Sequence, residues 1–301
     1  MNLTVLGSQG AIPKVGKYST SLLLNISNSN ILIDCCEGVQ HQLRNYKIKF
    51  SKIDIILISH AHGDHYFGLI GLISTFSLLK REKKLTVFCP TSVLKIVQSH
   101  IKYSKIKLNY DLDLKSLSNK SEKIIYENLD FTIKAFPLKH SVYTNGFRIE
   151  EKKKRRKLLI EKAVKYKIDK VYFNKLTKSK NVFNIEGEEI NYLNVTTDGP
   201  KSKSFAYCSD TAYFDKLVDY IRCVDLLYCE TTFLEKDRQK ALSTLHSTTT
   251  DAANLAKKGT VKQLLIGHFS SRYDDYSKFL KEVALIFDNV TLSEEGKKIQ
   301  L

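Results

Sequence analysis

An apolar run that ends in a dense histidine cluster constrains the fold of this 301-residue chain more than any other feature. Residues 56–65 read ILISHAHGDH, so His60, His62, Asp64 and His65 directly follow a strand-like segment. Imidazole and carboxylate groups at this spacing suit a metal ion such as zinc. His60 and His62 on an extended segment can face one ion, while Asp64 and His65 can serve a second. The sequence therefore predicts a two-metal site beside the protein core.

Four other apolar runs also end in a metal-binding or acid–base side chain. They are FPLKH at His140, AYCSD at Asp210, LLYCE at Glu230 and LLIGH at His268. Ligands from distant positions converge when several strands end on the same edge of a rigid sheet. One zinc ion needs three or four protein ligands, so we expect these strand ends to complete the cluster. Gly63 is expected to permit the tight backbone that the cluster needs.

Local patterns predict an α/β chain. Short runs rich in Ile, Leu and Val, bounded by Gly, Asn, Ser or Asp, predict strands in the first, middle and last parts of the sequence. Helical spacing is found from about residue 67 to 79 and over 91–101, and TTTDAANLAKKG has N-cap residues before it and a glycine at its end. Length and apolar content fit one large domain.

The composition excludes a membrane protein and a disulfide-bonded one. The longest apolar run, YFGLIGLISTFSLL, has 14 residues, whereas a bilayer span needs roughly 20. The first residues lack the basic region of a signal peptide. The six cysteines show no C-x-x-C pairing and are expected to be small buried side chains in a reducing compartment. We therefore expect a soluble cytoplasmic protein.

Most of the positive charge lies in one segment. The chain has a formal net charge of +16, and residues 152–180 contain 13 Lys or Arg against only Glu161 and Asp169, a net charge of +11. Tyr166, Tyr172 and Phe173 are interleaved with these cations. A dense basic segment with aromatic side chains is typical of a surface that binds a polyanion such as nucleic acid, although a charge run can also be a solvated face.

The motifs resemble those of a known family. SHAHGDH is similar to the H-x-H-x-D-H motif of the metallo-β-lactamase superfamily. LGSQGAIP, IDCCEGVQHQLR, PLKHSVYTNGFRIEEK, CSDTAY, CETTFL, HSTTTDAA and IGHFSSRY fall in the order seen in the tRNase Z family of tRNA 3′-processing endoribonucleases, in its short bacterial form. The resemblance spans essentially the whole chain, and HST together with GHFSSRY is its most specific part.

This resemblance implies the fold and the metal ligands. The expected fold is a four-layer αββα sandwich, with one domain over residues 1–301 and an inserted basic arm at about 150–190. One zinc ion would be held by His60, His62 and His140. The second would be held by Asp64, His65 and His268. Asp210 would bridge both ions.

The resemblance also implies a reaction and its catalytic residues. The enzyme would remove the 3′ trailer from precursor tRNA by cleaving after the discriminator nucleotide, which leaves a 3′-hydroxyl on the tRNA. Asp64 would orient or deprotonate the attacking water, and His246 beside Glu230 would protonate the departing oxygen. Ser247 and Thr248 precede a helix, where free N–H groups can hold a substrate phosphate; plain N-capping is the alternative role.

Further substrate contacts are expected from the arm and the site edge. They are Arg272 and the basic residues Lys153, Lys154, Arg155 and Arg156. The sequence departs from the family in two places. The arm lacks the usual Gly-Pro tip, and the early stretch PKVGKYSTS has Lys17 and Tyr18 where Arg and Asn are common. By resemblance, the protein is expected to act as a homodimer.

Two other classes of function fit part of these observations. A small-molecule hydrolase of the same fold, such as a lactonase, arylsulfatase or phosphodiesterase, would share the metal ligands. It would need neither the basic segment nor His246 beside Glu230. A non-catalytic RNA-binding protein would be expected to lack some ligands, and all seven expected positions carry a ligand. Manganese and iron are alternatives to zinc at such a site.

Overall fold

The computed structural model describes all residues from 1 to 301 and divides the chain into two compact units. The larger unit comprises residues 1–150 and 203–301, and the smaller unit comprises residues 151–202. Each unit has its own hydrophobic core. The predicted arm range of 150–190 lies almost entirely in the smaller unit, which continues as far as Ser202.

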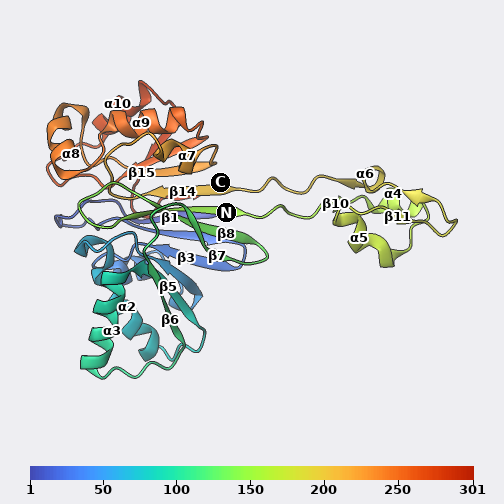
Figure 1. Cartoon of the computed structure of the whole chain (residues 1–301), viewed down its shortest axis with the longest axis horizontal. Helices are drawn as coiled ribbons and strands as arrows, with labels where there is room; N and C mark the ends of the chain where they lie inside the picture. The colour runs from blue at the N-terminus through green and yellow to red at the C-terminus, as the bar shows by residue number, and fades with distance from the viewer. The chain divides into compact units, whose positions relative to one another are not determined.

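The larger unit contains two seven-stranded sheets (Figure 1). Sheet 1 has the strand order β18-β1-β2-β3-β4-β5-β6, and its strands from β3 to β6 are parallel. In chain order these strands are β1 (Asn2–Gly7), β2 (Ser21–Ile26), β3 (Ser29–Ile33), β4 (Ile53–Leu57), β5 (Leu85–Pro90), β6 (Leu112–Leu117) and β18 (Lys298–Gln300).

Sheet 2 is built from strands between Lys123 and Leu292 and has the order β17-β16-β15-β14-β9-β8-β7. Strands β14 to β17 are parallel, and β9 joins β14 in antiparallel pairing. The strands are β7 (Lys123–Glu127), β8 (Phe131–Pro137), β9 (Asn145–Glu151), β14 (Ser204–Cys208), β15 (Leu226–Glu230), β16 (Gln263–Gly267) and β17 (Val290–Leu292).

Helices cover the outer face of each sheet. The core on the outer side of sheet 1 contains residues of α1 (Val39–Asn45), α2 (Gly63–Leu78) and α3 (Thr91–Ser104). The corresponding core of sheet 2 contains residues of α7 (Leu217–Ile221), α8 (Arg238–Thr244), α9 (Thr249–Lys258) and α10 (Ser277–Ala284). Two short 3₁₀ turns, η1 (Phe50–Lys52) and η3 (Glu235–Asp237), connect elements of these layers.

A third core lies between the two sheets, because strand side chains alternate between faces. In β8, Phe131, Ile133 and Ala135 are buried between the sheets, whereas Phe136 belongs to the core under the helices of sheet 2. The parallel strands have both faces buried, which explains their nearly continuous apolar sequences. The predicted four-layer αββα architecture is thus confirmed.

The smaller unit is built from short elements around six buried aliphatic side chains. Its two two-stranded sheets pair β10 (Lys157–Leu158) with β13 (Thr196–Thr197) and β11 (Val182–Phe183) with β12 (Glu189–Ile190). Its helices are α4 (Ile160–Lys165), η2 (Lys170–Tyr172), α5 (Phe173–Thr177) and α6 (Tyr192–Val195). Residues 151–202 carry fourteen Lys or Arg and seven Asp or Glu, a net charge of +7. The charge excess of 152–180 is therefore partly balanced by the returning chain.

Three local expectations can be compared with the structure. Helix α2 begins at Gly63, not near residue 67, so Asp64 and His65 lie in its first turn. Gly63 is the first residue of α2 and its φ angle is not positive, but an added Cβ would lie 2.2 Å from the ring of Phe67, so the backbone is tight at this position. Five cysteines are buried, Cys223 is exposed, and none forms a disulfide. No helix is long and apolar enough to span a bilayer.

Candidate metal-dependent active site

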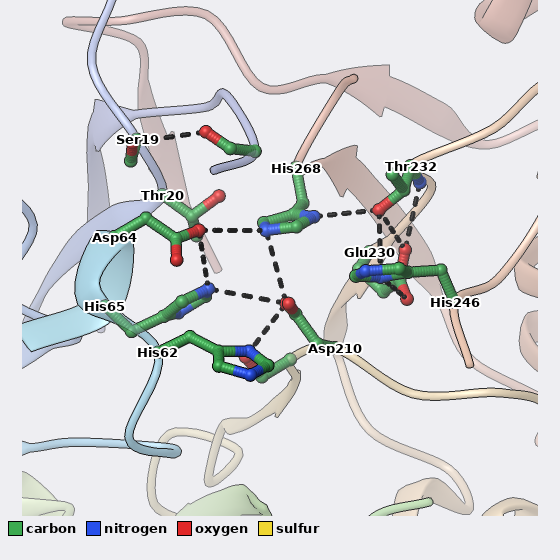
Figure 2. A network of polar contacts seen from close by, with 12 residues as sticks. Ser19, Thr20, His62, Asp64, His65, Asp210, Glu230, Thr232, His246 and His268 are labelled. Carbon is green, nitrogen blue, oxygen red and sulfur yellow. Dashed lines mark hydrogen bonds and ion pairs between the residues drawn. The ribbon is translucent and has the colours of Figure 1, made fainter. Parts of the chain in front are cut away.

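The predicted ligands gather where strands of both sheets end. Figure 2 shows His62, Asp64, His65, Asp210 and His268 close to one another. Sheet 1 supplies His60 and His62 from the segment after β4, and Asp64 and His65 from the first turn of α2. Sheet 2 supplies the remaining ligands from the segments that follow β8, β14 and β16. These are His140, Asp210 and His268. The ends of these strands therefore converge, as expected.

The first group is formed by three histidines. Nε2 of His60 lies 3.0 Å from Nδ1 of His62, and Nε2 of His140 lies 3.3 Å from the same atom. Oδ2 of Asp210 lies 3.6 Å from Nε2 of His60 and 3.9 Å from Nε2 of His140. Four potential ligand atoms therefore surround one point, which suits the tetrahedral coordination that zinc prefers.

The second group lies on the other side of Asp210. Oδ2 of Asp64 is 3.2 Å from Nε2 of His65 and 3.5 Å from Nε2 of His268. Oδ1 of Asp210 is 3.5 Å from Nε2 of His65 and 3.3 Å from Nε2 of His268. One oxygen of Asp210 thus faces each group, which is the arrangement of a carboxylate that bridges two cations.

The electrostatics of the second group fit a bound cation. Oδ2 of Asp64 and the Nε2 atoms of His65 and His268 are buried and have no hydrogen-bond partner. A buried polar atom left unpaired costs about 1–3 kcal/mol. Burial would lower the pKa of His65, but the charges of Asp64, Asp210 and Asp34 outweigh it and hold the pKa well above its usual value. A divalent ion at this point would satisfy all three atoms.

Each ligand histidine except His62 is held through its Nδ1 nitrogen. Nδ1 of His65 donates to Asp34 at 2.7 Å, and Nδ1 of His140 donates to the Leu245 carbonyl at 3.1 Å. Nδ1 of His60 lies 2.9 Å from the hydroxyl of Ser59. These bonds leave Nε2 free to face the ligand group, as is usual for metal-binding histidines.

Asp34 holds several parts of the site together. It is fully buried and accepts hydrogen bonds from the backbone and hydroxyl of Ser59, from His65 and from the hydroxyl of Tyr207. Its φ angle is 54°, and that of His268 is 60°, which places both non-glycine residues in the left-handed region. Such backbone strain is concentrated at functional sites. Sequence reasoning missed Asp34, although it also stands at the end of an apolar run.

His246 and Glu230 form a close pair beside the ligand groups. Nδ1 of His246 donates to Oε1 of Glu230 at 2.9 Å, and Glu230 is fully buried. Burial would lower the pKa of His246, but the charge and hydrogen bond of Glu230 outweigh it and raise the pKa to about 9. The imidazolium form is thereby favoured at neutral pH.

Thr232 connects this pair to a ligand histidine. Its hydroxyl donates to Oε2 of Glu230 at 2.7 Å and can therefore accept from Nδ1 of His268 at 2.8 Å. The same hydroxyl lies 3.2 Å from Nδ1 of His246. Figure 2 shows this threonine between the two rings. Thr232 was not singled out from the sequence, because no spacing rule links it to His268.

The site opens into a cavity of about 700 Å³. Its lining includes His62, Asp64, His140, Asp210, His246 and His268. Lys240 of α8 and Arg272 also line it. The guanidinium carbon of Arg272 lies 5.1 Å from the ring centroid of Phe233. The cavity therefore combines ligand groups, an acidic proton donor and two cations that can face an anionic substrate.

The other predicted substrate-binding residues lie in two places. Ser247 and Thr248 are buried, and their polar groups are used inside the protein. Ser247 donates from its backbone to Glu230 and from its hydroxyl to Thr211, while Thr248 is the N-cap of α9 in a capping box with Asp251.

The four basic residues at the start of the smaller unit differ in their contacts. Lys153 is exposed, and Lys154 forms an ion pair with Glu151 at 3.1 Å. Arg155 donates to Asn174 at 3.0 Å, and Arg156 pairs with Asp198.

Comparison with known sequences gives full-length relatives. Ribonuclease Z of Bacteroides thetaiotaomicron is 36% identical over 299 residues, which are 99% of this chain and 95% of the relative. Ribonuclease Z of Cytophaga hutchinsonii is 39% identical over 295 residues, which are 98% and 94% of the two chains. Residues 1–181 match a family model described as Anti-Pycsar protein Apyc1.

Solved structures share the fold at lower identity. The short form of human tRNase Z has a TM-score of 0.74 at 22% identity, covering 100% of this chain and 99% of that one. The metallo-β-lactamase fold protein YhfI of Bacillus subtilis has a TM-score of 0.69 at 19% identity, covering 99% of each chain. By its full-length relatives this metallo-β-lactamase-fold chain belongs to the ribonuclease Z family, and by its first 181 residues to the family that the Apyc1 model describes.

Proposed function

We propose that this chain is a metal-dependent endoribonuclease that removes the 3′ trailer from precursor tRNA and leaves a 3′-hydroxyl on the tRNA. Full-length similarity to proteins named ribonuclease Z supports this assignment. The structural observation that carries it is the His246–Glu230 pair, which lies in the same cavity as the two ligand groups around Asp210. A phosphodiesterase that expels a sugar hydroxyl needs such a proton donor.

We infer that two ions bind, one at His60, His62 and His140 and the other at Asp64, His65 and His268, with Asp210 shared. The ligand types favour zinc. Bound divalent ions would supply Lewis-acid stabilisation of the phosphodiester and activation of water at neutral pH.

The protein's own side chains account for the proton transfers. Asp64 would orient the attacking water and accept a proton from it as the water oxygen adds to phosphorus. His246 is held by Glu230 through Nδ1, so its Nε2 would give a proton to the O3′ atom as the P–O3′ bond breaks. Lys240 and Arg272 would attract the phosphate groups that flank the cut.

We further propose that residues 151–202 form an arm that holds the tRNA body, within a homodimer in the cytoplasm. The net charge of +7 and the exposed Lys153 support contact with a phosphate backbone. A small neutral ester would gain nothing from this segment, which favours the RNA substrate over the small-molecule alternative.

Cleavage of a 5′-labelled precursor tRNA with a short 3′ trailer tests this function. We expect one cut just after the discriminator nucleotide, a 3′-hydroxyl end and complete inhibition by a chelator. A metal-loaded protein that leaves this RNA intact but hydrolyses a small chromogenic phosphodiester would instead be a small-molecule hydrolase.

A further inference from the structure

A second cavity, of about 490 Å³, lies in the helical layer of sheet 1. It is formed by the end of α1, the η1 turn and the loop that follows α2. Its lining includes Arg44, Lys49, Phe50, Phe76, Lys80 and Arg81. None of the residues that line it also lines the active-site cavity. Its volume is within the range of ligand pockets.

Aromatic rings and guanidinium groups form one wall of this cavity. The rings of Phe50 and Phe76 meet edge to face with centroids 6.4 Å apart. The guanidinium carbon of Arg44 lies 5.3 Å from the Phe50 centroid, and that of Arg81 lies 4.9 Å from the Phe76 centroid. Both rings are buried, whereas Arg44 is exposed, so its flat guanidinium, backed by Phe50, is the surface on which a nucleobase can stack.

The cavity also carries positive charge that the protein does not neutralise. Arg44, Lys49 and Lys80 are exposed, and no carboxylate lies within 4.0 Å of their charged atoms. Lys83 is neutralised by Asp54 at 2.5 Å, and Glu82 is the one acidic residue in the lining. The balance favours an anionic ligand.

Arg81 is a buried cationic side chain in the lining of this cavity. Its relative exposure is 5%, and its Nε and Nη2 donate to the carbonyls of Lys83 and Lys84 at 2.6 and 2.9 Å. Its Nη1 is buried and has no hydrogen-bond partner. A buried donor without an acceptor is costly, so the two carbonyls hold Arg81 in the cavity wall with one of its donors left unpaired.

We propose that this cavity binds a nucleotide, with the base against the Arg44–Phe50 wall and the phosphate near Lys49 and Lys80. The ligand can be a free mononucleotide or one nucleotide of a single-stranded RNA, because both present the same base and phosphate. The proposal concerns a site apart from the cleavage centre and does not depend on the proposed reaction.

Photolabelling of the full-length protein with 8-azido-AMP tests this inference. We expect label on peptides that contain residues 44–52 or 76–83. AMP should compete better than adenosine or ribose 5-phosphate, because only AMP has both base and phosphate. Competition by a short single-stranded oligoribonucleotide below the concentration at which AMP acts would identify RNA as the source of the nucleotide, and the reverse order would identify the free nucleotide.

A matched pair of double variants provides the control. Arg44→Ala with Lys80→Ala should reduce this labelling about tenfold, the effect of losing about 1.4 kcal/mol of binding energy. Lys95→Ala with Lys123→Ala removes the same charge from exposed positions outside the cavity and should leave labelling unchanged. Equal labelling of both double variants, no competition by either nucleotide source, or label confined to the active-site cavity would overturn the proposal. Equal melting temperatures of the two variants establish that folding is not the cause.

Discussion

Oδ2 of Asp34 lies 2.7 Å from Nδ1 of His65, and both side chains are completely buried. The carboxylate fixes the imidazole so that Nε2 faces Asp64 and Asp210. Loss of such a supporting carboxylate commonly weakens metal affinity 10–100-fold. Asp34 is therefore expected to govern metal binding although it is not itself one of the proposed ligands.

Asp34→Asn tests this role. We expect about a 10–100-fold weaker affinity for zinc, because a neutral amide holds His65 less firmly. Competition with a chromophoric chelator measures that affinity. Asp130→Asn, at an exposed turn, is the matched control and should bind zinc like the unchanged protein. Normal affinity in Asp34→Asn would show that the carboxylate serves only the packing of Tyr207 and Ser59.

Replacement of His246 separates proton transfer from metal binding. His246→Ala should lower turnover of precursor tRNA by about 10²–10⁴-fold, as expected for loss of a general acid, while the zinc content stays the same. Turnover and elemental analysis are measured on one preparation, with His41→Ala, an exposed histidine, as the control. Zinc loss from His246→Ala would mean that the residue is a ligand.

The smaller unit can be removed without separating the strands that it connects. Glu150 of β9 pairs with Ser204 of β14, and the hydroxyl of Ser202 donates to the Lys152 carbonyl at 3.0 Å. A short Gly-Ser linker in place of residues 153–201 should therefore preserve the larger unit. We expect loss of precursor tRNA cleavage and retention of activity on a small phosphodiester. Parallel loss of both activities would indicate a structural role for the segment.

Asp225 is expected to make stability depend on pH. Burial raises its pKa, but the hydrogen bond from Lys262 at 2.6 Å and those from Ser204 outweigh it, so the pKa is lower in the folded protein. Lys203 also faces it at 3.6 Å. Its stabilising effect is therefore full above the unfolded pKa of about 3.9 and is lost as the pH falls below that value.

Urea unfolding of Asp225→Asn measures this effect. At pH 7 the variant should be less stable by about 1–2 kcal/mol, and the difference from the unchanged protein should shrink as the pH falls from about 4 to about 3. Asp219→Asn removes an exposed pairing with Arg222 and should show no measurable change. A difference for Asp225→Asn that is constant across this pH range would refute the assignment.

The α/β class and the convergence of ligands could be predicted because both follow from local patterns, whereas the four-layer arrangement was expected from the family resemblance. Apolar runs that end in His140, Asp210 and His268 place those residues at strand ends, and parallel strands end at one edge. The N-cap of α9 was also readable, since Thr248 and Asp251 have the spacing of a capping box.

Other parts of the site depend on contacts between distant segments. Asp34 meets Tyr207 across 173 residues of sequence, and Thr232 meets His268 only because β15 and β16 are neighbours. Helix α2 begins earlier than its apolar spacing indicated, because its first turn carries the polar residues Asp64 and His65.

The compact fold of the smaller unit was likewise not evident from its basic first half. Its core includes Val182, Ile190 and Val195 from the returning chain. These residues lie beyond the segment 152–180 in which the positive charge is concentrated.

The two-sheet origin of the ligands has a consequence for biosynthesis. His60 and Asp64 are translated early, whereas Asp210 and His268 belong to the last third of the chain. Ions bound by ligands from both sheets would link sheet 1 to sheet 2. They would therefore stabilise only a chain in which both sheets have formed. A chain that ends prematurely before Asp210 lacks the shared carboxylate. Only the complete chain would therefore have every ligand that the proposed nuclease activity requires.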